Sequence, residues 1–202
     1  MGHNKAVPRR ISLCLMAVCL MAGCERNSDQ GEKLALEIQE EWRNMASCDG
    51  EVKLEAQYED REFSCVVTLE YDRQQGGRLT FVEPELVKGI TVGVREGGLT
   101  LSQGDVLVDT GPILSDGTSP VESLGTLYHL ATEGFLDTAE AEGESLSVTC
   151  RQEEGNAGEG IEGVFCLDSR SHLPLTAQLY EDGVLVISAE FRDMSLTEEE
   201  KP

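Results

Sequence analysis

Residues 51–71 read EVKLEAQYEDREFSCVVTLEY, and the alternation of polar and apolar side chains in this stretch decides the fold class. Apolar residues occupy every second position from Val52 to Tyr58, and again from Phe63 to Tyr71. A period of two is typical of a strand with one buried and one solvated face. The acidic pair at 59–60 predicts a turn, so we expect an antiparallel β-hairpin.

Similar short apolar segments, separated by glycine-rich or acidic turns, follow along the chain. Four more strands are expected before residue 110, and four in the C-terminal half. Their apolar positions fall within residues 79–81, 90–94, 99–101, 106–108, 146–150, 164–167, 173–179 and 185–191. Together with the first hairpin, they predict an antiparallel sheet of about ten strands at ordinary strand lengths.

Two amphipathic helices are expected beside this sheet. Residues 32–45 carry Leu34, Ile38 and Trp42 at spacings of four, which places one apolar stripe on a helix. Ser119 and Pro120 are typical of a helix start, and the apolar pattern continues toward Phe135. The fold class is therefore α+β, with the large sheet curled over two helices so that its apolar face is buried.

The N-terminal segment has the layout of an export signal. Three basic residues precede a 12-residue apolar run (11–22), which ends in Leu20-Met21-Ala22-Gly23-Cys24. This ending resembles a bacterial lipobox, in which the cysteine is acylated after cleavage, and the run is shorter than the roughly 20 residues of a transmembrane helix. We therefore expect a signal peptide (1–23), a lipid anchor on Cys24, a flexible tether (24–31), a folded domain (32–196) and an acidic tail (197–202). The protein is expected on the extracytoplasmic face of the cell membrane.

The charge of the chain limits its partners. Removing residues 1–23 leaves 13 basic and 38 acidic residues, a formal charge of −25. Such a surface repels phosphate backbones and anionic lipid headgroups, which argues against nucleic-acid binding. A basic envelope protein is compatible with it, as is a solvated acidic surface without a partner.

Four cysteines remain after Cys24. If the hairpin between residues 150 and 166 is centred near Gly158, Cys150 and Cys166 lie directly opposite each other, and an oxidising compartment would allow a disulfide between them. A pair of reduced, buried thiols is the alternative. Linkage of Cys48 and Cys65 is left open. Zinc binding is not favoured, because the chain has no CxxC pair.

The sequence carries none of the common catalytic or cofactor-binding motifs. It has no GxSxG, no HExxH, no glycine-rich phosphate loop and no EF-hand ligand series. Asp168 and His172 are four residues apart and flank two serines, but two neighbouring residues do not make a triad without a third group placed in space. His129 is expected to be a packed or surface residue. We therefore expect no enzyme activity and no cofactor.

The order of elements resembles the LolA/LolB-like superfamily of lipoprotein carriers. The resemblance covers residues 32–193 and is most specific at Leu173-Pro174-Leu175, Tyr180-Glu181-Asp182-Gly183 and Phe191-Arg192-Asp193. In layout the chain is most similar to the membrane-anchored, spore-germination (GerS-like) group. The resemblance implies an incomplete barrel whose sheet wraps helices over an apolar cavity. It also implies either an acyl-chain ligand or action through a protein partner.

Two functions follow as expectations. The first is a lipid-anchored binding protein that holds an apolar ligand or an envelope partner without transforming it. The alternative is a regulatory lipoprotein with a filled core that acts through a basic partner, for example in spore or cell-wall processes. A cavity of several hundred Å³ lined by apolar side chains would favour the first, and a solid interior the second.

Overall fold

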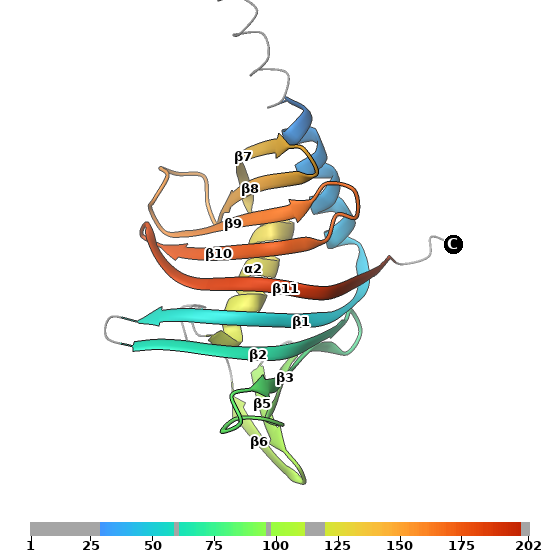
Figure 1. The fold of residues 1–202 in the computed structure, drawn as a ribbon, viewed down its shortest axis with the longest axis vertical. Coiled ribbons are helices and arrows are strands. Elements are labelled where there is room, and N and C mark those ends of the chain that lie inside the picture. Colours follow the sequence, from blue (N-terminus) through green and yellow to red (C-terminus); the bar gives the residue numbers. More distant parts are fainter. Residues whose placement is uncertain (1–28, 59–60, 96–97, 112–119, 199–202) are drawn as a thin grey trace, which may run out of the picture.

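The computed structural model describes residues 29–58, 61–95, 98–111 and 120–198, which form one antiparallel sheet of 11 strands with two helices (Figure 1). The strand order is β6-β5-β4-β3-β2-β1-β11-β10-β9-β8-β7. The helices are α2 (Pro120–Glu133) and an N-terminal helix at residues 29–43. The strands are β1 (Met45–Tyr58), β2 (Arg61–Asp72), β3 (Gly76–Glu83), β4 (Thr91–Arg95), β5 (Gly98–Gln103), β6 (Val106–Gly111), β7 (Phe135–Glu142), β8 (Ser145–Arg151), β9 (Ile161–Asp168), β10 (Pro174–Glu181) and β11 (Val184–Glu198). The α+β fold class is confirmed.

The β1–β2 hairpin forms as its alternation predicts. Val52 pairs with Val67 and Leu54 with Cys65, and these four side chains are at most 2% exposed. The residues between them point to the other face of the sheet, since neighbouring side chains alternate along a strand. The six strands expected before residue 110 are all present as β1–β6.

The C-terminal half contains one strand more than predicted. Strand β7 reads FLDTAEAE and pairs with β8 at one end of the sheet order. Its burial pattern marks Ala139 alone as buried, so the apolar alternation is too weak to indicate a strand. Acidic side chains on an edge strand also discourage pairing with another chain.

Two boundaries differ from the sequence-based expectation. Residues 29–31, expected in the flexible tether, are helical, and a Cβ added to buried Gly31 would lie 2.6 Å from the carbonyl oxygen of Ala139. The N-terminal helix therefore packs directly on β7. At the other end, Thr197 and Glu198, expected in the acidic tail, pair with the start of β1.

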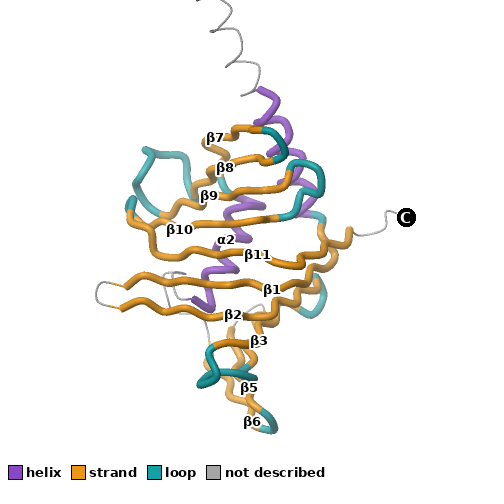
Figure 2. Tube along the Cα trace, in the orientation of Figure 1, coloured by secondary structure: helices purple, strands orange, loops and turns teal. Residues whose placement is uncertain are grey.

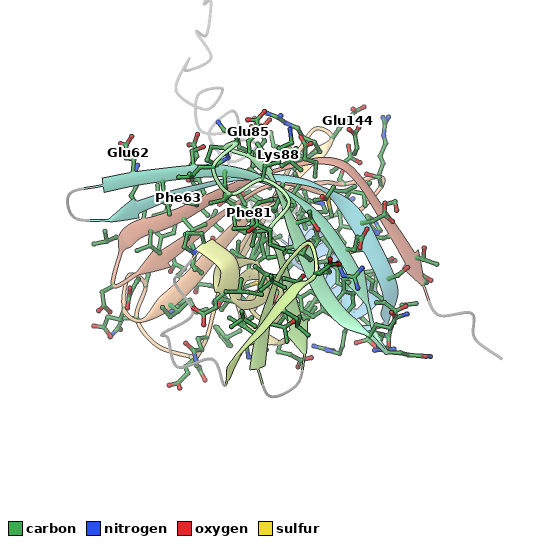
Figure 3. The ribbon with its side chains drawn as sticks, turned by 90° about the horizontal axis from the view of Figure 1, so that it is seen from below. Glu62, Phe63, Phe81, Glu85, Lys88 and Glu144 are labelled. Carbon is green, nitrogen blue, oxygen red and sulfur yellow. The ribbon has the colours of Figure 1, made fainter. Side chains whose placement is uncertain are left out.

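The sheet curls around α2 and leaves its two end strands unpaired with each other (Figures 1 and 3). The pairing of β1 with β11 joins the N-terminal and C-terminal halves at the middle of the sheet (Figure 2). Side chains from α2 and from the inner face of the sheet form one apolar core, including Leu54, Leu130, Leu146 and Ile187. The arrangement is the expected incomplete barrel. In the described ranges, no helix combines the length and apolar character needed to cross a bilayer.

The predicted disulfide between Cys150 and Cys166 is wrong. Cys150 pairs with Gly163, and Cys166 pairs with Ser147, so the hairpin is shifted by three residues from the expected register. An odd shift moves one residue to the opposite face of the sheet. Cys150 lies in the core, whereas Cys166 falls between the core residues Phe165 and Leu167 and faces outward. Both are free cysteines, as are Cys48 and Cys65.

Candidate functional site

An apolar hollow of about 470 Å³ lies on the inner side of the curled sheet. Its walls come from α2, the end of the N-terminal helix, the inner faces of β1–β4, and parts of β9, β10 and β11. The lining residues are Trp42, Met45, Cys48, Leu69, Tyr71, Arg73, Gly76, Gly77, Leu79, Val94, Leu124, Gly125, Leu127, Tyr128, Phe165, Pro174, Phe191, Met194 and Leu196. A hollow of this volume and lining falls within the range of about 300–1,000 Å³ in which proteins hold small molecules.

Two glycines help to keep this hollow open. Gly77 of β3 stands in register with Tyr71 and Val94, whose side chains also line the hollow. A Cβ at Gly77 would meet only the Cβ of Val94, at 3.8 Å, and a Cβ at Gly125 of α2 would meet no atom within 4 Å. Larger side chains would therefore fit at both positions and would fill part of the space. Glycine inside a helix also costs about 1 kcal/mol relative to alanine.

Two tyrosines and one arginine bring polar atoms to the hollow. The rings of Tyr71 and Tyr128 lie 5.5 Å apart, and the Tyr128 hydroxyl donates to the carbonyl oxygen of Trp42 over 3.3 Å. Burial, helped by the neighbouring Tyr71, raises the pKa of Tyr128 to about 12. The phenol therefore stays protonated at neutral pH. Arg73 is exposed yet lines the same hollow, which places it at the mouth.

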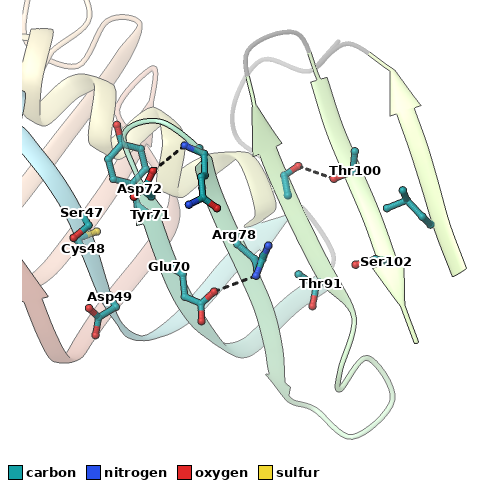
Figure 4. Close-up of a pocket in the computed structure, with 15 residues that line it drawn as sticks. Ser47, Cys48, Asp49, Glu70, Tyr71, Asp72, Arg78, Thr91, Thr100 and Ser102 are labelled. Atoms are coloured by element: carbon teal, nitrogen blue, oxygen red, sulfur yellow. Dashed lines mark hydrogen bonds and ion pairs between the residues drawn. The ribbon is translucent and has the colours of Figure 1, made fainter. Parts of the chain in front are cut away.

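A second, polar groove of about 680 Å³ lies on the outer face of β1–β6 (Figure 4). A row of register partners crosses it from Asp49 through Glu70, Arg78 and Gly93 to Thr100. Glu70 and Arg78 approach to 3.6 Å as an exposed pair. Because an exposed ion pair contributes little binding energy, this groove is a weaker candidate for a small-molecule site.

The histidine near Asp168 has a structural partner. His172 Nδ1 lies 2.6 Å from a carboxylate oxygen of Glu41, and the His172 carbonyl accepts a 3.1 Å hydrogen bond from Trp42 Nε1. These contacts attach the N-terminal helix to the β9–β10 turn. Asp168 accepts from the backbone N–H and hydroxyl of Ser171, which lower the pKa of its carboxyl group. Asp168 and Ser171 therefore stabilise the turn.

The three most buried thiols are kept in the protonated form. Burial raises the pKa of Cys150 to about 12 and that of Cys65 to about 11. Burial and then the charge of Asp49 raise the pKa of Cys48 to about 11. A reactive cysteine needs a lowered pKa, so these thiols act as apolar packing groups. Within the described ranges, no group of three or more His, Cys, Asp or Glu is placed to hold a metal ion.

The sequence-based site predictions have different outcomes. Cys24, the expected lipid anchor, lies outside the described residues. His129 is exposed on α2, so of the two alternatives expected for it, a packed or a surface residue, the second holds. Sequence reasoning missed Arg73 and Gly125 as lining residues. A basic residue just after an apolar strand, in a strongly acidic chain, was the available signal for Arg73.

Comparison with known proteins adds structural likeness at low sequence identity. No protein-family model and no curated protein matches the sequence. The LolA superfamily protein NE2245 from Nitrosomonas europaea is similar over 84% of this chain and 94% of its own, with 12% identity and a TM-score of 0.43. A chain in the structure of the CwlD amidase from Clostridioides difficile with the GerS lipoprotein is similar over 96% of this chain and 98% of its own, with 11% identity and a TM-score of 0.42. LprF from Mycobacterium bovis is similar over 83% of this chain and 94% of its own, with 11% identity and a TM-score of 0.42. LolA superfamily proteins, expected from the sequence, are thus among the similar structures.

Proposed function

We propose that this protein is a non-catalytic, lipid-anchored binding protein of the extracytoplasmic membrane face, and that it holds an apolar ligand in the hollow beneath its curled sheet. The observation that carries the proposal is the apolar hollow of about 470 Å³. A regulatory protein with a filled core has no need of such a space.

The energetics of the hollow support ligand binding. Side chains that line an open apolar space lack packing partners on one side and lose the dispersion contacts of a filled core. Substitutions at Gly77 and Gly125 could fill part of the space without steric conflict. Natural proteins commonly retain such stability costs where function requires them. An apolar ligand would restore the missing contacts.

The proposed anchor places this hollow at a membrane. The lipobox-like Leu20-Met21-Ala22-Gly23-Cys24 precedes residue 29, the first described residue of the N-terminal helix, by only five positions. Several acyl chains on Cys24 would hold the domain far more firmly than a single chain does. The anchored domain would meet apolar ligands at the surface where they are most abundant.

Ligand uptake by the mature chain tests the proposal. Both described helices, all 11 strands and the whole core lie within residues 29–198, so the chain from residue 25 onward contains the complete described fold. We expect native mass spectrometry to detect co-purified lipid, and a fluorescent fatty acid to bind with one site per chain. Gly125→Phe should abolish uptake because the new ring would occupy the hollow.

His129→Phe is the matched control, since His129 is exposed on the same helix and does not line the hollow. It should leave uptake unchanged. Circular dichroism should show both variants folded. Absence of co-purified lipid together with no uptake by the wild-type chain would reject the proposal, as would equal uptake by Gly125→Phe.

A partner-binding function is the second candidate, and the acidic surface favours it. Asp49, Glu70 and Asp72 line the outer groove, and the whole chain carries a formal charge of −22. Such a surface steers a basic protein toward it, and salt screens the attraction. A pull-down from membranes should therefore recover a basic partner at low salt and lose it at high salt. Recovery that is independent of salt would contradict this electrostatic mechanism.

A further inference from the structure

The two end strands of the sheet differ in what they expose. Strand β7 carries three acidic residues, and the N-terminal helix packs on it. Strand β6, at the other end of the sheet order, begins with Val106, Leu107 and Val108, which are 63%, 70% and 50% exposed. Among the described residues, β5 is the only strand that pairs with β6. An uncharged apolar edge of this kind is a template for pairing with another chain.

The inner face of β6 continues a row of core side chains. The row consists of register partners on four successive strands, which are Leu79, Val92, Leu101 and Val108. Their exposed fractions are 4% and 1% for the first two residues, and rise to 37% and 50% toward the edge. Side chains directly opposite each other on neighbouring strands pack together. A further strand beside β6 would therefore extend the row and bury the side chain of Val108.

The outer face of β6 borders an acidic region. Leu107 projects to that face, where it lines the outer polar groove. The described lining of this groove contains three carboxylates and one guanidinium, from Asp49, Glu70, Asp72 and Arg78. Asp105 is exposed in the turn before β6, and neither β5 nor β6 contains a basic residue. A strand that carries basic residues matches this surface, whereas a second copy of the acidic chain would be repelled.

The position of β6 favours a protein over a lipid surface as its occupant. The N-terminal helix begins at residue 29 beside β7, and β6 lies at the far end of the sheet (Figure 1). Eleven strands spaced by about 4.8 Å place these ends roughly 48 Å apart along the curled sheet. An anchor on Cys24, which is part of the proposed function, would hold the β7 end near the membrane. The acidic surface also opposes flat contact with anionic headgroups.

We propose that the exposed edge of β6 binds an extended, basic segment of a partner protein, which adds to the sheet as a further strand. Backbone hydrogen bonds to β6 supply affinity, and alternate side chains supply selectivity. Apolar residues of the segment cover Val106 and Val108 on the inner face, and its basic residues lie near Asp105 and the outer groove. This site goes beyond the proposed function, since Val106 and Val108 do not line the apolar hollow.

Titration of the mature chain with defined peptides tests the proposal. The capped peptide KVTVTVK alternates apolar and polar residues between two lysines, and it should shift the amide NMR signals of β5 and β6. The acidic peptide EVTVTVE should bind more weakly by roughly tenfold or more, because its charges have the same sign as those of the protein. N-methyl groups on the central residues of KVTVTVK remove its N–H donors. The methylated peptide should also lose roughly tenfold in affinity, as expected for about two lost hydrogen bonds.

Val108→Asp separates strand addition from simple attraction between charges. The variant is more acidic, which would strengthen a purely electrostatic attraction, but it places a charge on the inner face of the edge strand and so opposes pairing. It should weaken binding of KVTVTVK by roughly fivefold or more, because the apolar contact is lost. Val184→Asp is the matched control, since Val184 is 64% exposed on β11, a strand with neighbours on both sides. It should leave peptide binding unchanged. Both variants should take up the fluorescent fatty acid as the wild type does, and circular dichroism should show both folded.

Several results would overturn the proposal. Absence of shifts in β5 and β6 at millimolar KVTVTVK would reject the site, and equal binding of the methylated peptide or of Val108→Asp would show that charge alone attracts the peptide. A dimer of the mature chain that sediments as a monomer after Val108→Asp would identify a second copy as the occupant. Cosedimentation with phosphatidylcholine and phosphatidylglycerol vesicles that Val108→Asp abolishes would identify lipid. Each of these results leaves ligand binding in the hollow intact, whereas failure of the wild type to take up fatty acid would reject the proposed function alone.

Discussion

The hollow should be visible in the energetics of two leucines on the same helix. Leu124 and Leu130 both belong to α2 and are 8% and 1% exposed. Leu124 lines the hollow, whereas Leu130 packs against β9, where its Cδ1 would lie 3.1 Å from a Cβ added to Gly163. Alanine at each position removes the same atoms from the same helix, so the effect of helix propensity largely cancels.

The expected costs follow from what each truncation leaves behind. Three carbons at about 0.8 kcal/mol each give about 2.4 kcal/mol of lost transfer free energy at either position. At Leu130 the truncation also creates a closed cavity in a packed region, which raises the total to about 4–5 kcal/mol. At Leu124 it only enlarges an existing open hollow, so the cost should stay near 2.4 kcal/mol. The difference between the two variants is about 2 kcal/mol.

Urea unfolding of the mature chain, followed by circular dichroism, measures this difference. With an m value of about 2 kcal/mol/M, Leu130→Ala should unfold at about 1 M less urea than Leu124→Ala. The m values of the two variants must agree for the comparison to hold. Equal midpoints, or a lower midpoint for Leu124→Ala, would show that the region around Leu124 is packed like the rest of the core.

The remaining predictions concern the anchor and the thiols. In cells grown with a clickable fatty acid, Cys24→Ala should abolish labelling of this protein and release the protein from the membrane fraction. Cys19→Ala should change neither the labelling nor the location. Labelling of the Cys24→Ala variant would refute the anchor. A thiol assay of the mature chain in denaturant without reductant should count four free thiols, and a lower count would indicate a disulfide. Alkylation of the native protein at pH 8 should modify Cys166 before Cys150. Because burial raises the pKa of Cys150 from 9.0 to about 12, its contribution to stability is complete below about pH 9 and is lost as pH rises toward 12. Cys150→Ala should therefore flatten the loss of stability between pH 9 and 11, and an unchanged slope would contradict this reasoning.

Local patterns in the sequence determined much of the sheet. The alternation at residues 51–71 reports which side chains share a face, and the structure pairs Leu54 with Cys65 inside the core accordingly. The same reasoning failed at β7, where a single buried alanine leaves the alternation too weak to indicate a strand. It also failed at Cys150 and Cys166, because a turn rich in glycine and glutamate does not specify its own centre. A three-residue change in register was enough to place the two thiols on opposite faces.

The sequence by itself determined the fold class, the acidic surface and the expectation of a lipid anchor, since each depends on composition or on the period of a short segment. Only the tertiary structure decided that β1 pairs with β11, that Arg73 stands at the mouth of the hollow, and that Gly77 and Gly125 line the same space. The physical reason is that a cavity is the volume left when distant segments pack together. That volume depends on which side chains meet across the curled sheet, and no local pattern records such a meeting.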